Sequence, residues 1–204
     1  MTSHPKDATD ELFEVMADCR KVARHIHLPF QAGNDRILKL MNRGYTYEGY
    51  LNKIKYARKL MPDIVITSDV IVGYPTETEE EFEDTLRLMG EVRFDAMFTF
   101  IYSKRPGTAA AQLTDPVSRK EKQKRFDKLL EVQNKISEEK HMEYVGKNVT
   151  VLVDETVNDI NYPLRARTNG NRLVHLKGQP ECLGNFIDVK ITGCSTFALF
   201  GEVI

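Results

Sequence analysis

The sequence has no tryptophan and only three cysteines, Cys19, Cys182 and Cys194, which lie far apart along the chain. None of them belongs to a Cys-x-x-Cys pair, the spacing that metal sites and redox centres use. We therefore predict reduced, buried thiols and no metal site built from cysteine.

The sequence also lacks a long apolar run, and residues 1–10 contain no stretch typical of a signal peptide. We therefore expect a cytoplasmic protein without a membrane span.

The sequence also lacks an excess of charge of one sign. Its 29 Lys and Arg residues are balanced by 30 Asp and Glu residues, which gives a formal net charge of −1. The whole chain thus gives no electrostatic argument for nucleic-acid binding. Hydrophobic residues make up 41% of the 204 residues, which predicts a packed core rather than disorder.

Helix and strand patterns alternate in the first 140 residues. Apolar residues recur at helical spacing in 10–19, 47–60 and 120–140, and Thr78 opens a capping box with Glu81 at the start of a further helix. Strands are predicted at 25–30, 64–72 and 96–102. The run 64–72 is apolar on both faces, as a buried parallel strand requires. The alternation predicts parallel strands with helices outside.

The pattern changes after residue 141. Five short strands, at 149–154, 164–168, 172–176, 186–192 and 196–203, are separated by turns rich in Gly and Asn. They predict a second domain over 141–204, a small all-β barrel or sandwich. We interpret Phe197, Leu199 and Phe200 as part of its core.

Five segments occur in the order in which one known family carries them. They are 3–7 (SHPKD), 27–35 (HLPFQAGND), 43–46 (RGYT), 69–78 (DVIVGYPTET) and 100–108 (FIYSKRPGT). Together they resemble the methylthiotransferases, radical SAM enzymes that insert sulfur and a methyl group into tRNA or a ribosomal protein. Segments 165–174 and 195–202 resemble that family's TRAM domain, an OB-like β-barrel that binds RNA.

The resemblance implies both fold and function. Residues 1–140 are expected to form part of a parallel (β/α) radical SAM barrel without its N-terminal strands, and 141–204 the TRAM RNA-binding domain. The implied activity is methylthiolation of N6-isopentenyladenosine next to the anticodon, with S-adenosylmethionine and two 4Fe-4S clusters as cofactors and the tRNA anticodon stem-loop as partner. Arg105 and Pro106 stand where the ribosomal-protein branch has an acidic pair. Threonylcarbamoyladenosine in tRNA is the alternative substrate.

The cysteines that hold the family's clusters are absent from this sequence. Relatives carry three of them in a preceding domain and three in a Cys-x3-Cys-x2-Cys loop, whereas this chain begins just after the third barrel strand of the family pattern. Cluster iron requires closely placed thiolates. We therefore expect no cluster and no radical chemistry from this chain alone, and assign no catalytic residue. The alternatives are an RNA-binding module, or a split-enzyme subunit completed by a separate N-terminal polypeptide.

Candidate cofactor contacts lie at the predicted strand ends, where parallel barrels bind ligands. They are Pro29, Gln31, Gly33, Ser68, Asp69 and Gly73. Gln31 both donates and accepts hydrogen bonds, which suits a ribose or an amino-acid moiety, and Gly33 permits close backbone approach. Ser68 and Asp69 are expected to face opposite sides, and the Asp69 carboxylate requires a donor from a neighbour. The resemblance implies that this set contacts S-adenosylmethionine.

Two histidines, His25 and His27, share one face of the strand before these candidates. Their spacing is compatible with a metal ion, but no third ligand of the usual kind lies near them in the sequence. We therefore predict packing or hydrogen-bonding roles for both.

Candidate RNA contacts fall into two groups, Lys104 and Arg105 in one, and Arg165, Arg167, Arg172 and Lys177 in the other. The first group follows a strand end in a turn, where it can meet a phosphate. The second lies between residues 160 and 180, a stretch without an acid, which predicts a local basic patch for a phosphate backbone. Tyr162 and His175 are placed to stack on bases. A solvated surface without RNA is the alternative for both groups.

Overall fold

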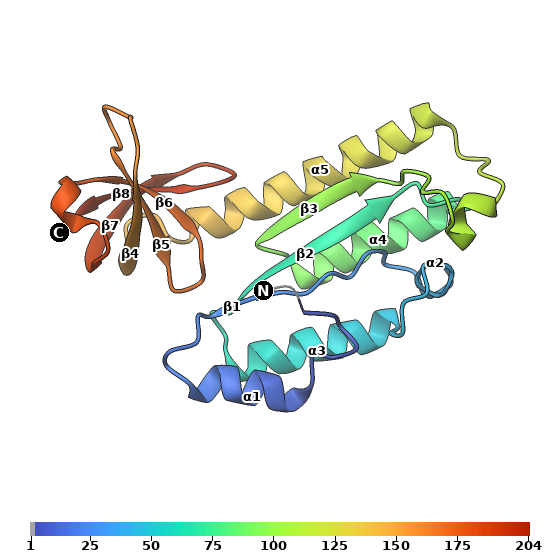
Figure 1. Cartoon of the computed structure of the whole chain (residues 1–204), viewed down its shortest axis with the longest axis horizontal. Helices are drawn as coiled ribbons and strands as arrows, with labels where there is room; N and C mark the ends of the chain where they lie inside the picture. The colour runs from blue at the N-terminus through green and yellow to red at the C-terminus, as the bar shows by residue number, and fades with distance from the viewer. Residues whose placement is uncertain (1–2) are drawn as a thin grey trace.

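The computed structural model describes residues 3–204 (Figure 1). Parallel strands and their helices form the first part: α1 (Asp10–Asp18), β1 (His25–His27), α2 (Asp35–Leu40), α3 (Tyr47–Leu60), β2 (Val65–Val72), α4 (Glu79–Val92), β3 (Ala96–Ile101) and the 3-10 turn η1 (Ala109–Gln112). The long helix α5 (Arg119–Met142) then leads to the second part. That part contains β4 (Asn148–Thr156), β5 (Leu164–Thr168), β6 (Leu173–Lys177), the 3-10 turn η2 (Pro180–Cys182), β7 (Phe186–Cys194) and β8 (Leu199–Val203).

Each of the five α-helices within residues 3–204 begins where the sequence places a capping side chain. In each, a side-chain oxygen accepts a hydrogen bond from the first turn and so satisfies a backbone donor that has no partner within the helix. The predicted capping box of α4 is confirmed, with Thr78 and Glu81 bonded reciprocally. The capping residues are Thr9, Asn34, Thr46, Thr78 and Ser118.

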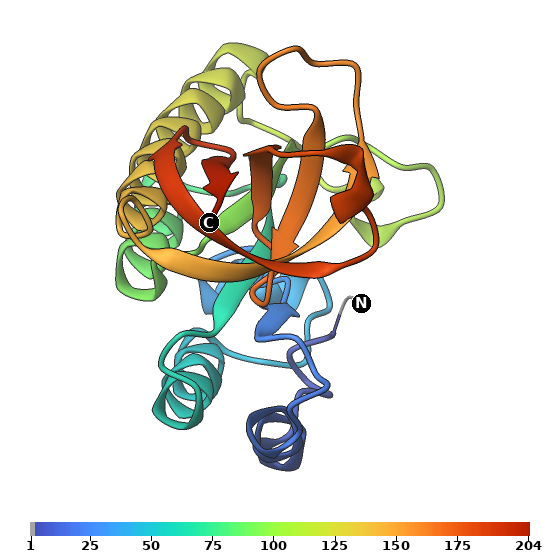
Figure 2. The ribbon, with the colours of Figure 1, turned by 90° about the vertical axis from the view of Figure 1, so that its left-hand side faces the viewer.

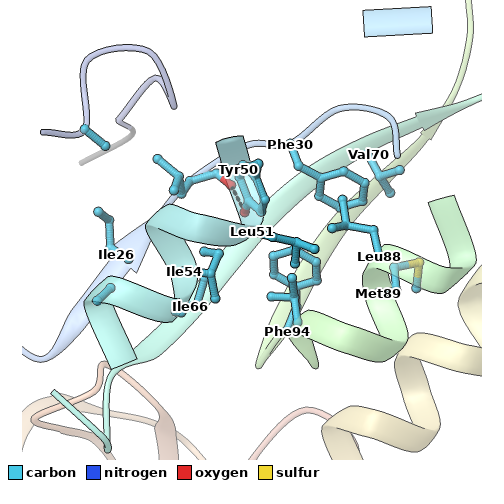
Figure 3. Packing of buried hydrophobic residues seen from close by; sticks show 14 of the residues in the cluster. Ile26, Phe30, Tyr50, Leu51, Ile54, Ile66, Val70, Leu88, Met89 and Phe94 are labelled. Carbon is cyan, nitrogen blue, oxygen red and sulfur yellow. Dashed lines mark hydrogen bonds between the residues drawn. The ribbon is translucent and has the colours of Figure 1, made fainter. Parts of the chain in front are cut away.

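The three strands of the first part form one parallel sheet in the order β1-β2-β3, as the alternation predicted. β1 is shorter than the predicted strand 25–30 because Pro29, which has no N–H, follows its end. Figure 3 shows the covered face of the sheet, where Ile66 and Val70 meet side chains of α3 and α4 such as Ile54 and Leu88.

The opposite face of the sheet is open. Phe98 and Phe100 of β3 lie on it with 63% and 50% of their surface exposed. Thr67, Asp69 and Ile71 of β2 lie beside them, as the strand register shows. Parallel sheets are normally covered on both faces, so this open face is a surface to be explained.

Strands β4 to β8 close into a barrel in the order β4-β5-β6-β8-β7, with β6 and β8 parallel and the other pairs antiparallel (Figure 2). This confirms the barrel and excludes the sandwich. Leu199 is fully buried in the barrel core, as predicted. The prediction for Phe197 is wrong, because Phe197 precedes β8 and is 79% exposed. Phe200 is also outside the core, since it follows Leu199 in the strand and faces outward.

None of the helices within residues 3–204 has the length and apolar character that a bilayer crossing requires. The three cysteines are free, as expected, but they are half-buried rather than buried. Burial raises the pKa of the Cys194 thiol.

Gly33 marks the closest approach between the loop after β1 and α4. A Cβ on Gly33 would lie 2.5 Å from the Cα of Thr85. We expect Gly33→Ala to lower the free energy of unfolding by about 1–3 kcal/mol, because backbone must move to make room. Chemical denaturation measures this.

Gly90 provides the matched control. It is exposed within α4, and among residues 3–204 no atom outside its own helical turn lies within 4 Å of a Cβ built there. Gly90→Ala should therefore raise the free energy of unfolding by about 0.5–1 kcal/mol through helix propensity. Equal effects of the two substitutions would contradict the close packing at Gly33.

Candidate functional site

The loop after β1 is fixed by three hydroxyl groups. The Ser68 hydroxyl donates to the carbonyl of Leu28 at 2.8 Å and accepts from the N–H of Phe30 at 2.9 Å. Tyr50 donates to the same Leu28 carbonyl at 2.8 Å, and Tyr45 donates to the carbonyl of Phe30 at 3.2 Å. Ser68 is fully buried on the covered face, so its predicted cofactor contact is wrong and its role is to hold this loop.

Three other candidates for cofactor contacts, Pro29, Gly33 and Gly73, also pack within the protein. Pro29 is buried within the loop. Gly33 packs against α4, and its N–H donates to the hydroxyl of Thr85 at 2.9 Å. Gly73 adopts φ of 68° and donates to the buried carboxylate of Glu77 at 2.8 Å. Gly33 was predicted to permit close backbone approach and Gly73 to contact the cofactor, but the groups that lie against both belong to the protein itself.

Gln31 and Asp69 remain as ligand-facing candidates, and the structure brings them together. Both line a cleft of about 680 Å³ at the C-terminal ends of the strands. Gln31 has φ of 66°, a left-handed conformation that costs a non-glycine residue roughly 1–3 kcal/mol. Two hydrogen bonds hold it there, from its N–H to the carbonyl of Asp69 and from the N–H of Ile71 to its own carbonyl, both 2.9 Å. Such strain is concentrated at functional sites.

The same cleft contains two residues that the sequence reasoning missed. The Nε of Arg43 and the hydroxyl of Tyr102 are buried, and neither has a hydrogen-bond partner within residues 3–204. Buried donors are normally satisfied, so these two polar groups beside the cleft are exceptions that call for an explanation. Each belongs to a segment on which the family resemblance rests, and that is the signal by which they could have been found.

The structure identifies His27 as the neighbour that supplies the donor expected for Asp69. Its Nε2 lies 3.2 Å from Asp69 Oδ1, on the open face of the sheet. His25 and His27 both contact the hydroxyl of Thr67, at 3.0 and 2.9 Å. The predicted hydrogen-bonding roles of the two histidines are therefore confirmed. Within residues 3–204 no group of three or more His, Cys, Asp or Glu side chains is arranged to hold a metal ion.

Arg172 is not part of an RNA-binding surface, contrary to the prediction. Its side chain is 6% exposed, and the guanidinium pairs with Asp95, the residue that precedes β3. The guanidinium also lies over the ring of Tyr144, with 5.0 Å to the ring centroid. Lys140 of α5 reaches Asp95 at 2.9 Å as well. Arg172 thus joins the barrel to the sheet.

Other contacts support the same junction. The backbone N–H of Arg24 donates to the carbonyl of Asn169 at 3.1 Å. Gly170 packs so closely that a Cβ on it would lie 2.3 Å from a methyl of Val65. His141 Nδ1 lies 2.9 Å from the carbonyl of Ser195, and burial lowers the pKa of His141. The turn between β5 and β6 is therefore seated against the start of the sheet.

The remaining cations of the barrel are exposed to different degrees. Arg165 is half-buried and donates to the carbonyl of Tyr162 at 3.0 Å, while Arg167 is exposed and lies 3.3 Å from Asp154. Lys177 is exposed, with its ammonium 5.8 Å from the Tyr162 ring centroid. The cations of residues 160–180 are thus partly neutralised by acidic side chains that lie outside this stretch of the sequence. The basic patch is therefore weaker than predicted.

Three rings gather beside these cations on the outside of the barrel. Tyr162 lies 5.1 Å from Phe200 and 6.4 Å from His175, and His175 lies 5.3 Å from Phe200, between ring centroids. Tyr162 and His175 were predicted to stack on bases, and the structure adds Phe200 to them. Burial lowers the pKa of His175, which favours its neutral ring.

Lys104 and Arg105 lie far from the barrel patch. Both are exposed in the loop after β3, and Arg105 lines the cleft. In Figure 1 this loop and η1 are at the end of the molecule opposite the barrel. The two predicted groups of RNA contacts are therefore separate surfaces.

Comparison with known proteins supports the division of the chain into a sheet part and a barrel part. Residues 1–89 match the radical SAM superfamily, and residues 142–204 match the TRAM domain. The fold of the chain is similar to that of the radical SAM enzyme coproporphyrinogen III oxidase from Escherichia coli, with a TM-score of 0.55 at 20% identity over 66% of this chain and 31% of that one.

The whole chain is similar to curated methylthiotransferases, which confirms the family predicted from the five segments. It is 47% identical over 203 residues to a tRNA-2-methylthio-N(6)-dimethylallyladenosine synthase of Acetivibrio thermocellus, covering 100% of this chain and 42% of the relative. It is 50% identical over 204 residues to the enzyme of the same name from a Thermoanaerobacter species, covering 43% of that relative. The chain thus spans less than half the length of these relatives.

The strain at Gln31 can be measured by comparing two substitutions that both remove its side chain. Gln31→Gly should unfold with a free energy about 1 kcal/mol higher than Gln31→Ala, because only glycine adopts a φ of 66° without cost. Denaturant titration of both variants gives the difference.

Lys55, an exposed residue within α3, is the control position. There the order should reverse, with the glycine variant about 1 kcal/mol less stable than the alanine variant. The same order at both positions would show that Gln31 is not held in a left-handed conformation.

Proposed function

We propose that this chain is part of an enzyme that methylthiolates N6-dimethylallyladenosine, the isopentenyl-modified adenosine, in tRNA. The observation that carries the proposal is sequence identity of 46–50%, over essentially the whole chain, to enzymes named for that reaction. Those names favour dimethylallyladenosine over threonylcarbamoyladenosine, the alternative substrate. The reaction needs a nucleoside cofactor and an RNA substrate. The cleft at the strand ends fits the cofactor, and the separate barrel with its three aromatic rings fits the RNA.

The two tasks divide along the chain in this proposal. Residues 1–140 contribute the later strands of a radical SAM barrel, and residues 141–204 form the TRAM domain that binds tRNA at its anticodon stem-loop. The closed five-strand barrel is OB-like in our interpretation, and OB-folds commonly bind oligonucleotides.

The cleft fits S-adenosylmethionine in the chemistry of its side chains. Gln31 and Asp69 offer hydrogen bonds to hydroxyl and amino groups, while Arg43 and Tyr102 offer unsatisfied donors to a carboxylate. When bound, this cofactor supplies the radical initiation and the methyl group that the family uses. The residues of this chain bind and orient it.

The residues of this chain do not fit an iron–sulfur cluster. Cys19 follows α1, Cys182 lies in η2 and Cys194 ends β7, so the three thiols belong to separate parts of the fold. In this proposal the ligands of the family's 4Fe-4S clusters come from residues outside these 204, on a longer polypeptide or on a separate N-terminal one. The same polypeptide would cover the open face at Phe98 and Phe100.

Iron binding tests the division between this chain and the rest of the enzyme. We expect the purified 204-residue chain, reconstituted anaerobically with iron and sulfide, to show no stoichiometric 4Fe-4S absorption or iron content. Its thiols are too few and too dispersed for a cluster. A stoichiometric, intact cluster on this chain would contradict that expectation.

RNA binding tests the role of the barrel. We expect the chain to bind an anticodon stem-loop RNA with an affinity that falls as salt rises. Replacing Arg165, Arg167 and Lys177 together with Ala should weaken binding and reduce the salt dependence, because fewer phosphate contacts release fewer counterions. Filter binding across a salt series measures both effects.

The matched control for RNA binding is Lys55→Ala, which removes one exposed cation from α3. It should leave affinity and salt dependence unchanged. An equal loss for this control would mean that binding is non-specific attraction, and no binding by a folded chain at low salt would contradict the RNA-binding role.

A further inference from the structure

The open face of the sheet carries a row of polar side chains that the cleft alone does not explain. His25 and His27 of β1, and Thr67 and Asp69 of β2, lie on this face in a continuous line. The distances are 3.0 Å from His25 Nε2 to Thr67 Oγ1, 2.9 Å from Thr67 Oγ1 to His27 Nδ1, and 3.2 Å from His27 Nε2 to Asp69 Oδ1. Asp69, at the end of the line, lines the cleft.

The donors and acceptors of this row point in one direction. An ionised carboxylate only accepts hydrogen bonds, so His27 must carry its proton on Nε2 to donate to Asp69. The Nδ1 of a neutral His27 is then an acceptor and receives the hydroxyl proton of Thr67. The oxygen of Thr67 is thereby left to accept from His25 Nε2–H. Burial lowers the pKa of His25, which favours its neutral form.

The row also has steric support. The ring of Phe98 meets that of His27 edge to face, with 5.8 Å between the centroids, and Phe98 stands opposite Asp69 in the strand register. His27 is 12% exposed, whereas Asp69 is 26% exposed at the cleft. The carboxylate is therefore held through one oxygen, while Oδ2 has no hydrogen-bond partner within residues 3–204.

We propose that His25, Thr67 and His27 form a one-way hydrogen-bond chain that orients Asp69, so that its free oxygen accepts a hydroxyl group of a ribonucleoside bound in the cleft. His27 and Thr67 are positioning residues in this account, and Asp69 is the residue that touches the ligand. Carboxylates accept ribose hydroxyl groups in the same way in dinucleotide-binding folds. The inference rests on the proposed function, because it assigns the cleft to the nucleoside part of S-adenosylmethionine.

Thr67→Val tests the hydrogen-bond chain in its middle and leaves His25 and Asp69 at its two ends unchanged. The substitution keeps the shape of the side chain and removes the hydroxyl. The probe is S-adenosylhomocysteine, titrated calorimetrically into the 204-residue chain. Thr67→Val should bind about tenfold more weakly than the parent chain, as expected for one misdirected hydrogen bond. Thr67→Ser, which restores the hydroxyl, should bind like the parent.

Two further measurements separate positioning from folding. Thr99→Val, the same substitution on β3 at a position outside the row, should leave binding unchanged. Long-range proton–nitrogen NMR should show His27 as the single Nε2–H tautomer in the parent chain and as a mixture of tautomers in Thr67→Val.

The outcomes distinguish this inference from the proposed function. If the parent chain binds the probe and Thr67→Val binds it equally well, the positioning role is overturned and the nucleoside cleft stands. If the folded parent chain does not bind the probe at all, the inference and the assignment of the cleft to S-adenosylmethionine are both overturned. Weaker binding by Thr67→Val, together with the loss of the single His27 tautomer, supports the proposed hydrogen-bond chain.

Discussion

The buried carboxylate of Asp95 is the constraint on which the rest of the structure depends. It stands directly before β3, and its Oδ2 accepts the N–H of Ile66 at 2.7 Å, which fixes the start of β2. Its Oδ1 faces Arg172 of the barrel and Lys140 of α5. Its carbonyl accepts the hydroxyl of Ser137 at 3.2 Å. A carboxylate this deeply buried is tolerated only with such partners, so sheet, helix and barrel are ordered around one charge.

This junction determines how the two candidate surfaces are presented. The barrel is seated against the N-terminal ends of the sheet strands, and the cleft with Gln31 and Asp69 is at their C-terminal ends. The barrel and the cleft are consequently at opposite ends of the sheet strands.

Local chemistry is what the sequence predicts well. The helix starts follow from capping residues such as Thr78, and the need of Asp69 for a donor follows from its place in an apolar strand; both are confirmed. Partners distant in the sequence are what it does not predict. Arg172 was assigned to RNA because no acid lies near it in the sequence, yet its partner Asp95 is 77 positions away. Phe197 was assigned to the core by residue type, although only its position before β8 decides its exposure.

The measurement that tests this account most directly is a double-mutant cycle between Arg172 and Asp95, using Arg172→Met, Asp95→Asn and the double variant in denaturant unfolding. If the buried pair joins the barrel to the sheet, the coupling energy should be about 1–3 kcal/mol, with each single variant strongly destabilised. If the effects of the two substitutions add to within about 0.5 kcal/mol, the pair does not join the two parts and the account is contradicted.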